Sequence, residues 1–188
     1  MGRHRQGRRV KAALVNQASP RYLFGPLTAL GLIVAALATG IDQAVKLWLI
    51  FIFHLAERGV VAIAPFIDLV LTWNAGISYG LFQQDTDFGR WVLLAIKGAA
   101  VVILWVWLAR VHGKMSAVAL GLIIGGAVGN AIDRLTYGAV ADYLLFHVDL
   151  AGGRFNWYVF NLADVAIVAG VIGLLYESFL GRGAAKAP

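Results

Sequence analysis

Charged and amide side chains stand in or beside apolar stretches of this chain, where lipid or a protein interior would surround them. They are Asp42, Lys46, Asn130, Asp133, Arg134, Asp142, Asn161 and Asp164. Ionisable side chains are costly to keep in such places and therefore indicate a functional site. The chain has no cysteine, and no two of its 4 histidines are four residues apart, which excludes thiolate chemistry and a zinc-binding HExxH helix. The remaining candidates are carboxylates, or a serine paired with a lysine.

Sequence spacing separates the carboxylates that have a nearby cation from those that do not. Asp42 and Lys46 are four residues apart, so on a helix they share a face and are expected to pair. Asp133 has Arg134 beside it, whereas Asp142 and Asp164 have no basic residue within one helical turn. Two unpaired carboxylates in a low-dielectric site tend to share one proton. This is the arrangement of an aspartic protease, in which one carboxylate activates water and the other polarises the scissile carbonyl.

The composition predicts that membrane helices position these residues. Hydrophobic residues make up 60% of the chain and charged residues 14%, against about 25% charged residues in an average soluble domain. The mean hydropathy is +0.76. We predict an all-α membrane protein of one domain, residues 1–188, because four apolar stretches are each close to the roughly 20 residues that cross a bilayer. The predicted transmembrane segments are 22–46, 91–110, 115–133 and 160–179.

The distribution of Lys and Arg predicts the orientation in the membrane. Most of these 16 residues lie in tails 1–21 and 180–188 or between the second and third segments, which places both termini in the cytoplasm. Segments 47–90 and 134–159 are then extracytoplasmic, and the polar side chains converge near the outer leaflet. Anionic headgroups and topology account for the basic N-terminal tail, so no nucleic-acid partner is expected.

The two outer segments have the patterns of short strands. Residues 67–73 are β-branched and partly alternating, and a turn signal follows at 74–76. Residues 143–148 and 155–160 flank an Ala-Gly-Gly turn and predict a hairpin. We therefore expect a small β-sheet, or cradle, at the outer membrane surface. Within the third transmembrane segment, Gly121, Gly125 and Gly129 form a stripe that lets another helix approach closely.

Four sequence blocks in order resemble one known family. They are Asp42-Gln43 with Lys46, NAGISYG at 74–80, GGAVGNAIDR at 125–134, and VAD at 140–142 followed by FNLAD at 160–164. With these blocks, residues 41–167 resemble signal peptidase II, the bacterial lipoprotein signal peptidase, an aspartyl endopeptidase of the inner membrane. One departure is Ile77-Ser78-Tyr79, where family members often have a small residue followed by Phe.

The resemblance implies roles for individual residues. The catalytic dyad would be Asp142 and Asp164. The substrate- and inhibitor-binding residues would be Asn74, Gly76, Asn130, Arg134 and Asn161, and the supporting residues would be Asp42, Lys46 and Asp133. The implied substrate is a diacylglyceryl-modified prolipoprotein that is cut just before the lipidated cysteine. The resemblance also implies that no metal or other cofactor takes part and that the cyclic peptide globomycin binds at the dyad.

Two other functions are compatible with the residues alone. A Ser/Lys membrane peptidase could use Ser78 with Lys46 or Lys97, since a desolvated lysine can act as a base. A small transporter would also explain charges within membrane segments. Lys97 is expected to extend towards the membrane surface or to face the polar residues. We expect a monomer, because one chain can complete the polar cluster.

Overall fold

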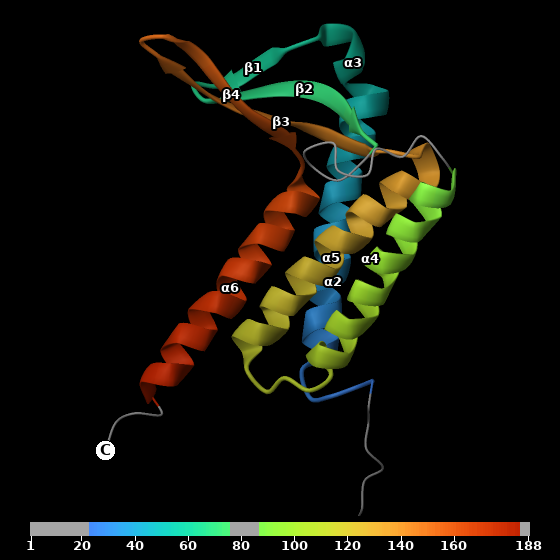
Figure 1. The fold of residues 1–188 in the computed structure, drawn as a ribbon, viewed down its shortest axis with the longest axis vertical. Helices are drawn as coiled ribbons and strands as arrows, with labels where there is room; N and C mark the ends of the chain where they lie inside the picture. Colours follow the sequence, from blue (N-terminus) through green and yellow to red (C-terminus); the bar gives the residue numbers. More distant parts are fainter. Residues whose placement is uncertain (1–22, 76–86, 185–188) are drawn as a thin grey trace, which may run out of the picture.

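The computed structural model describes residues 23–75 and 87–184. A helix bundle carries a small sheet at one end, and the first described residues and the C-terminal end of the last helix lie at the opposite end (Figure 1). The elements are α2 (Thr28–Leu47), the π-turn η1 (Trp48–Ile52), α3 (Leu55–Arg58), β1 (Val61–Ala64), β2 (Ile67–Asn74), α4 (Asp87–Leu108), α5 (Lys114–Tyr137), β3 (Val140–Leu150), β4 (Gly153–Phe160) and α6 (Leu162–Ala184).

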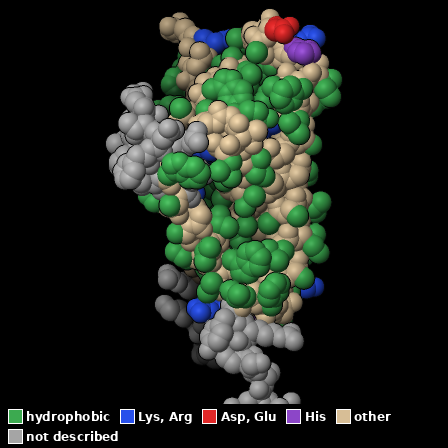
Figure 2. All heavy atoms as spheres, turned by 90° about the vertical axis from the view of Figure 1, so that its right-hand side faces the viewer, with side chains coloured by type: hydrophobic (Ala, Val, Ile, Leu, Met, Phe, Trp, Pro, Cys, Tyr) green, Lys and Arg blue, Asp and Glu red, His purple; other side chains and the backbone are tan. Residues whose placement is uncertain are grey.

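Within the described ranges, three helical segments are long and apolar enough to cross a membrane. They are Thr28–Ile52, Lys114–Tyr137 and Leu162–Phe179. The remaining expected segment, 91–110, falls on α4, where Ala95–Leu108 is a shorter apolar helix. A fourth crossing, by α4, therefore remains a prediction. The outer surface agrees with lipid contact: Figure 2 shows a face whose middle is covered by hydrophobic side chains, with charged side chains concentrated towards its two ends.

Two helices extend further towards the sheet than the apolar stretches indicate. The first continues through η1 to Ile52, because Leu49 in that turn is buried and fastens it to the sheet side of the protein. Likewise, α5 includes Arg134 and ends only at Tyr137. Gly138 then adopts a left-handed conformation, with φ of 80°, which is favourable for glycine and turns the chain from α5 into β3.

The sheet has the antiparallel order β1-β2-β3-β4. The predicted strand at 67–73 and the predicted hairpin are confirmed as β2 and as β3 with β4. The short strand β1 was not expected, since four residues carry too little alternation to be recognised. In β2 the register shifts between Leu69 and Thr72, and this bulge lies opposite the stretch of β3 that carries Asp142.

Helix α5 lies at the centre of the bundle and packs against α2 and α6 through glycines. A Cβ atom on Gly121 or Gly125 would collide with the backbone of α2, and one on Gly126 would collide with the backbone oxygen of Ala163 in α6. The expected close packing of the glycine stripe is therefore confirmed. This close approach brings the polar ends of α2, α5 and α6 together next to β3.

Candidate active site

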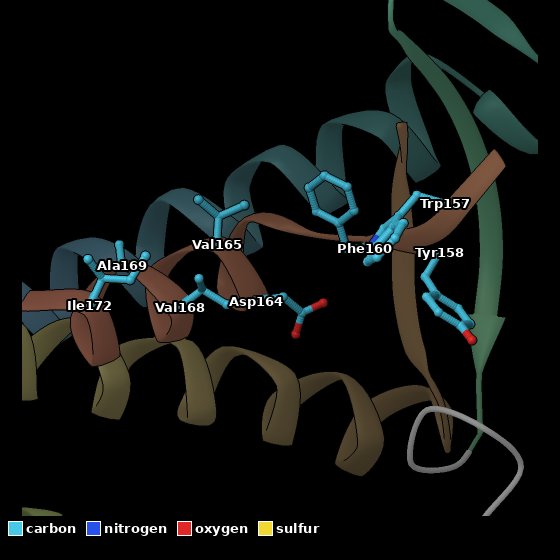
Figure 3. Close-up of a pocket in the computed structure, with 8 residues that line it drawn as sticks. All are labelled: Trp157, Tyr158, Phe160, Asp164, Val165, Val168, Ala169 and Ile172. Atoms are coloured by element: carbon cyan, nitrogen blue, oxygen red, sulfur yellow. The ribbon is translucent and has the colours of Figure 1, made fainter. Parts of the chain in front are cut away.

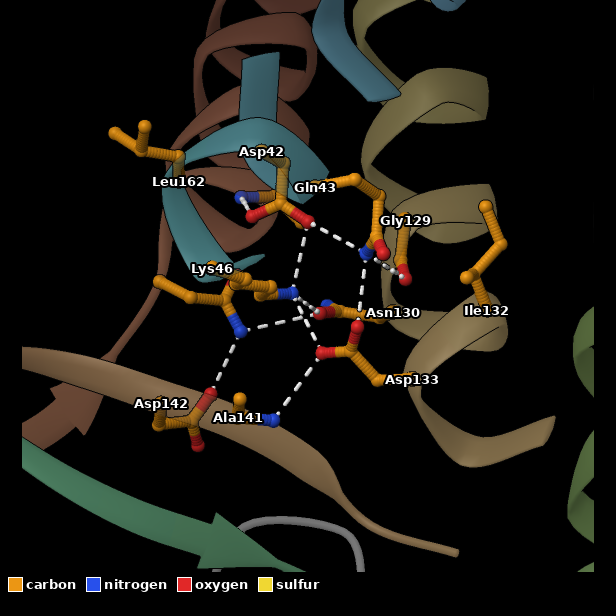
Figure 4. A network of polar contacts seen from close by, with 12 residues as sticks. Asp42, Gln43, Lys46, Gly129, Asn130, Ile132, Asp133, Ala141, Asp142 and Leu162 are labelled. Atoms are coloured by element: carbon orange, nitrogen blue, oxygen red, sulfur yellow. Dashed lines mark hydrogen bonds and ion pairs between the residues drawn. The ribbon is translucent and has the colours of Figure 1, made fainter. Parts of the chain in front are cut away.

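The predicted polar residues meet at the end of the bundle that carries the sheet. Their side chains come from α2, β2, α5, β3 and α6, and Figure 4 shows most of them in one network. Nine of the ten residues named from the resemblance lie in this cluster: Asp42, Lys46, Asn74, Asn130, Asp133, Arg134, Asp142, Asn161 and Asp164. Gly76 lies outside the described residues, as does Ser78. The fold thus brings together residues from elements that are far apart in the sequence.

Asp142 projects from β3 and is 3% exposed. Its Oδ1 accepts a hydrogen bond of 2.6 Å from Nδ2 of Asn161, and its Oδ2 accepts one of 3.1 Å from Nδ2 of Asn74. Asn74 reaches it diagonally across the sheet, because Thr72 is the direct partner of Asp142 and Asn74 lies two residues further along β2. Burial, assisted by the nearby charge of Asp164, raises the pKa of Asp142 to about 6, although the two hydrogen bonds act in the opposite direction.

Asp164 lies in the first turn of α6, where a capping arrangement holds it. The side-chain oxygen of Asn161 accepts the backbone N–H of Asp164 at 2.9 Å, and Oδ2 of Asp164 accepts the backbone N–H of Asn161 at 3.3 Å. Its Oδ1 accepts a hydrogen bond of 2.8 Å from Nδ2 of Asn130. Asn161 therefore contacts both aspartates and also donates to Oδ1 of Asn130 at 3.1 Å.

The buried ammonium group of Lys46 lies between two carboxylates. Its Nζ is 2.8 Å from Oδ2 of Asp42 and 2.7 Å from Oδ2 of Asp133. The expected pair of Asp42 with Lys46 is confirmed. For Asp133, however, sequence adjacency pointed to Arg134, whereas the structure provides Lys46, because neighbouring residues of a helix project in different directions.

These same carboxylates hold the backbone next to Asp142 and Asp164, the two residues of the expected dyad. Asp133 Oδ2 accepts the backbone N–H of Ala141 at 3.1 Å, directly before Asp142. Asp42 Oδ1 accepts the backbone N–H of Ala163 at 3.0 Å, directly before Asp164. The ion pairs of Lys46 therefore connect the two backbone segments from which the dyad projects.

Gln43 belongs to this network, although the sequence analysis did not assign it to the site. Its Nε2 donates to Oδ1 of Asp133 at 2.8 Å and to the backbone oxygen of Gly129 at 3.1 Å. The available signal was its place beside Asp42 in the first sequence block. It fastens α2 to α5 at the level of the polar cluster.

Arg134 supplies a second buried cation. It is 5% exposed, and Nη1 donates to the backbone oxygen of Asn130 at 3.2 Å. Asp142, Asp164 and Asp133 are its electrostatic neighbours. Its positive charge therefore lies where it can stabilise negative charge at the dyad. Across residues 23–75 and 87–184, no three His, Asp or Glu side chains are grouped as metal ligands.

A groove of about 480 Å³ opens beside Asp164, between the end of β4 and the outer face of α6 (Figure 3). Its lining is otherwise formed by aromatic and aliphatic side chains: Trp157, Tyr158, Phe160, Val165, Val168, Ala169 and Ile172. Figure 3 shows the carboxylate of Asp164 directed away from α6 beside these side chains. The groove can therefore hold an apolar chain with a polar bond placed at the carboxylate of Asp164.

Comparison with known proteins agrees with this site. The family model for signal peptidase (SPase) II matches residues 34–180. A lipoprotein signal peptidase from Nitrobacter hamburgensis is 61% identical over 158 residues, which are 84% of this chain and 96% of that protein. One from Rhodopseudomonas palustris (strain TIE-1) is 57% identical and covers 85% of this chain and 97% of its own.

The fold has a counterpart among solved structures. A bacterial membrane enzyme determined by the in meso method at 2.3 Å resolution superposes with a TM-score of 0.65 at 22% identity, covering 85% of this chain and 92% of that one. At this identity the likeness concerns the fold alone. The family match and the high identities to its members show that this chain belongs to the signal peptidase II family.

Proposed function

We propose that this peptidase is an aspartic endopeptidase that removes signal peptides from diacylglyceryl-modified prolipoproteins by cleaving just before the lipidated cysteine. The observation that carries the proposal is the pair of Asp142 and Asp164, joined through Asn161, with Asp164 lining an apolar groove. Such a site suits a substrate whose scissile bond lies next to an apolar segment. Membership of the signal peptidase II family supports the same substrate class.

In the proposed mechanism the dyad holds one proton. The ionised carboxylate takes a proton from water, and the resulting hydroxide attacks the scissile carbonyl carbon. The protonated carboxyl donates to the carbonyl oxygen, and a proton then passes to the leaving amine as the C–N bond breaks. The raised pKa of Asp142, about 6, supports this scheme, because this carboxyl keeps its proton to a higher pH than an ordinary aspartic acid does.

The other residues of the cluster bind substrate or hold the dyad. Asn74, Gly76, Asn130, Arg134 and Asn161 are proposed to line the substrate and inhibitor pocket. The guanidinium of Arg134 would donate to peptide carbonyls or to a lipid ester. Asp42, Lys46 and Asp133 support the dyad through the backbone contacts at Ala141 and Ala163. An extended substrate could also pair with a sheet strand, which would act as a clamp.

The proposed setting is the bacterial cytoplasmic membrane. Four crossings by a single domain, with both termini in the cytoplasm, would place the sheet and the dyad near the outer leaflet. The partners would be prolipoproteins, membrane lipid and the inhibitor globomycin, and the protein would act as a monomer. The described helices support three of these crossings directly.

Cleavage of a diacylglyceryl-modified prolipoprotein by the detergent-purified protein tests the proposal. A mobility shift on a gel with the parent, and none with folded Asp142→Asn or Asp164→Asn, is the expected result. Activity that survives both substitutions and is lost in Ser78→Ala would instead support the Ser/Lys peptidase. Absence of cleavage by the folded parent, together with solute flux in liposomes, would support a transporter.

A further inference from the structure

A second groove, of about 350 Å³, lies between α4 and α5. The residues that line it are Trp91, Lys97, Gly98 and Val101 from α4 and Ala127, Val128, Ala131, Ile132 and Leu135 from α5. Lys97 is the only charged residue among these, and the small side chains on both helices leave room beside it. This groove uses a different face of α5 from the one that meets α6, because Gly126 is the residue that packs against Ala163.

The ammonium group of Lys97 has no carboxylate within ion-pair distance among the described residues, although Asp164 is an electrostatic neighbour. Lys97 is half-buried and forms no hydrogen bond or ion pair with any other described residue, in contrast to Lys46 with its two carboxylates. An ammonium in apolar surroundings is costly unless oxygen atoms surround it. The groove therefore presents a hydrogen-bond donor for oxygen atoms of a ligand whose remainder is apolar.

The position of Lys97 connects this groove with the dyad. Its electrostatic neighbours are Arg134, which lies on α5, and Asp164, which lies on α6. The groove on β4 and α6 is thus lined by a carboxylate, that of Asp164, and the α4–α5 groove by an ammonium group. An ammonium group donates hydrogen bonds to ester carbonyl oxygens, whereas an ionised carboxylate has no hydrogen to donate.

We propose that the α4–α5 groove binds the diacylglyceryl group of the substrate and that Lys97 donates a hydrogen bond to an ester carbonyl oxygen of that group. The inference rests on the proposed function, in which a peptide and two acyl chains leave the same cysteine and need separate apolar channels. The peptide then follows the groove beside Asp164, where the bond to be cut must lie. Lys97 is a specificity-determining residue in this scheme and takes no part in the proton transfers.

Two matched substrates test the contact. One carries the ester-linked diacylglyceryl group, and the other carries the ether-linked dialkyl analogue, which lacks the carbonyl oxygens. The parent is expected to favour the ester about tenfold in kcat/KM, the effect of one hydrogen bond to a charged group. Lys97→Met should bring the ratio close to one, and Lys97→Arg should keep the preference. The ratio is internal to each variant, so a reduced folded fraction cancels.

Ile96→Met provides the matched control, since Ile96 is the neighbouring residue on α4 and its side chain is 60% exposed. It should keep the parent ratio. A tenfold preference that persists in Lys97→Met overturns the inference. The inference is also overturned if Lys97→Met keeps the parent ester/ether ratio but its cleavage rate depends on the phospholipid added. That result would assign the groove to membrane phospholipid. If the parent cleaves neither substrate, the proposed function itself fails.

Photocrosslinking locates the acyl chains independently of turnover. A substrate with a diazirine in its acyl chain is bound to Asp142→Asn, and the crosslinked peptides are identified by mass spectrometry. Crosslinks in α4 and α5 near Gly98 and Ala131 are expected. Crosslinks confined to α6 near Val168 and Ile172 would place the acyl chains in the other groove and contradict the inference.

Discussion

The side-chain amide of Asn161 donates a hydrogen bond of 2.6 Å to Oδ1 of Asp142. Through its other side-chain atom, Oδ1, the same residue accepts the backbone N–H of Asp164 at 2.9 Å. One asparagine thus orients a carboxylate on β3 and begins the helix that carries the second carboxylate. These two tasks are separable by mutation, because only the first requires an amide donor.

Asn161→Ser should lower kcat/KM by about 10- to 100-fold while changing the melting temperature little. A serine hydroxyl still caps α6, but it cannot reach both Asp142 and Asn130, and a hydrogen bond to a charged group contributes about 1.5–3 kcal/mol. Asn161→Ala removes the cap as well and should lose about 1 kcal/mol of stability in addition. Cleavage kinetics and thermal unfolding of the three proteins in detergent measure both effects. Parent-like cleavage by Asn161→Ser would contradict the orienting role.

The activity should depend on pH as a bell-shaped curve, because the proposed dyad of Asp142 and Asp164 is reactive with one proton bound. The pKa of Asp142 is raised to about 6 by burial, so the rate should fall as the pH rises through the upper pKa of the pair, at about this value or above. Asn74→Ala removes a hydrogen bond that favours ionised Asp142. The upper pKa then rises, and the alkaline limb of kcat/KM moves to higher pH.

Thr72→Ala is the control for this shift, since Thr72 lies opposite Asp142 in the sheet but has an exposed side chain. Its pH profile should match the parent. A profile that is flat across the acid range would argue against a shared proton. If the alkaline limb of the kcat/KM profile moved to lower pH in Asn74→Ala, this result would argue against the assigned role of the Asn74 amide.

Lys46→Met should strongly destabilise the protein. It leaves the buried carboxylates of Asp42 and Asp133 without their ammonium partner, and breaking a buried ion pair from one side costs about 3–5 kcal/mol. Replacing both aspartates by asparagine in the Lys46→Met background should restore much of the melting temperature, because no buried charge then remains unpaired. The asparagine oxygens can still accept the backbone N–H groups of Ala141 and Ala163. Equal melting temperatures for the single and triple variants would refute this explanation.

Gly126→Ala should reduce both stability and cleavage. The added Cβ would collide with the backbone oxygen of Ala163 and force α6 away from α5, which moves Asp164. Gly40→Ala is the matched control, since no atom lies within 4 Å of the Cβ position at Gly40. The control should be as stable as the parent or slightly more so, because alanine favours a helix more than glycine does. Full activity in Gly126→Ala would mean that this close contact does not position the dyad.

The sequence alone was sufficient for the features that depend on neighbouring residues. Apolar stretches predicted the helices, alternation and a glycine turn predicted β2 and the hairpin of β3 with β4, and spacing predicted the pair of Asp42 with Lys46. The glycine stripe of α5 predicted close helix packing, although it could not name the partner helix. Each of these patterns is local, because helix and strand periodicity fix which nearby side chains share a face.

Only the tertiary structure decided which distant side chains meet. Lys46 pairs with Asp133 from another helix, and Gln43 donates a hydrogen bond to the same carboxylate. Asn74 donates a hydrogen bond to Asp142 from the neighbouring strand. The placement of Lys97 in a groove apart from the main cluster also depends on how α4 lies against α5. Such partners are set by helix packing and strand register, in which residues far apart in the sequence become neighbours through the fold as a whole. The sequence thus identified the carboxylates, and the packing of α2, α5, α6 and β3 determined what holds them in place.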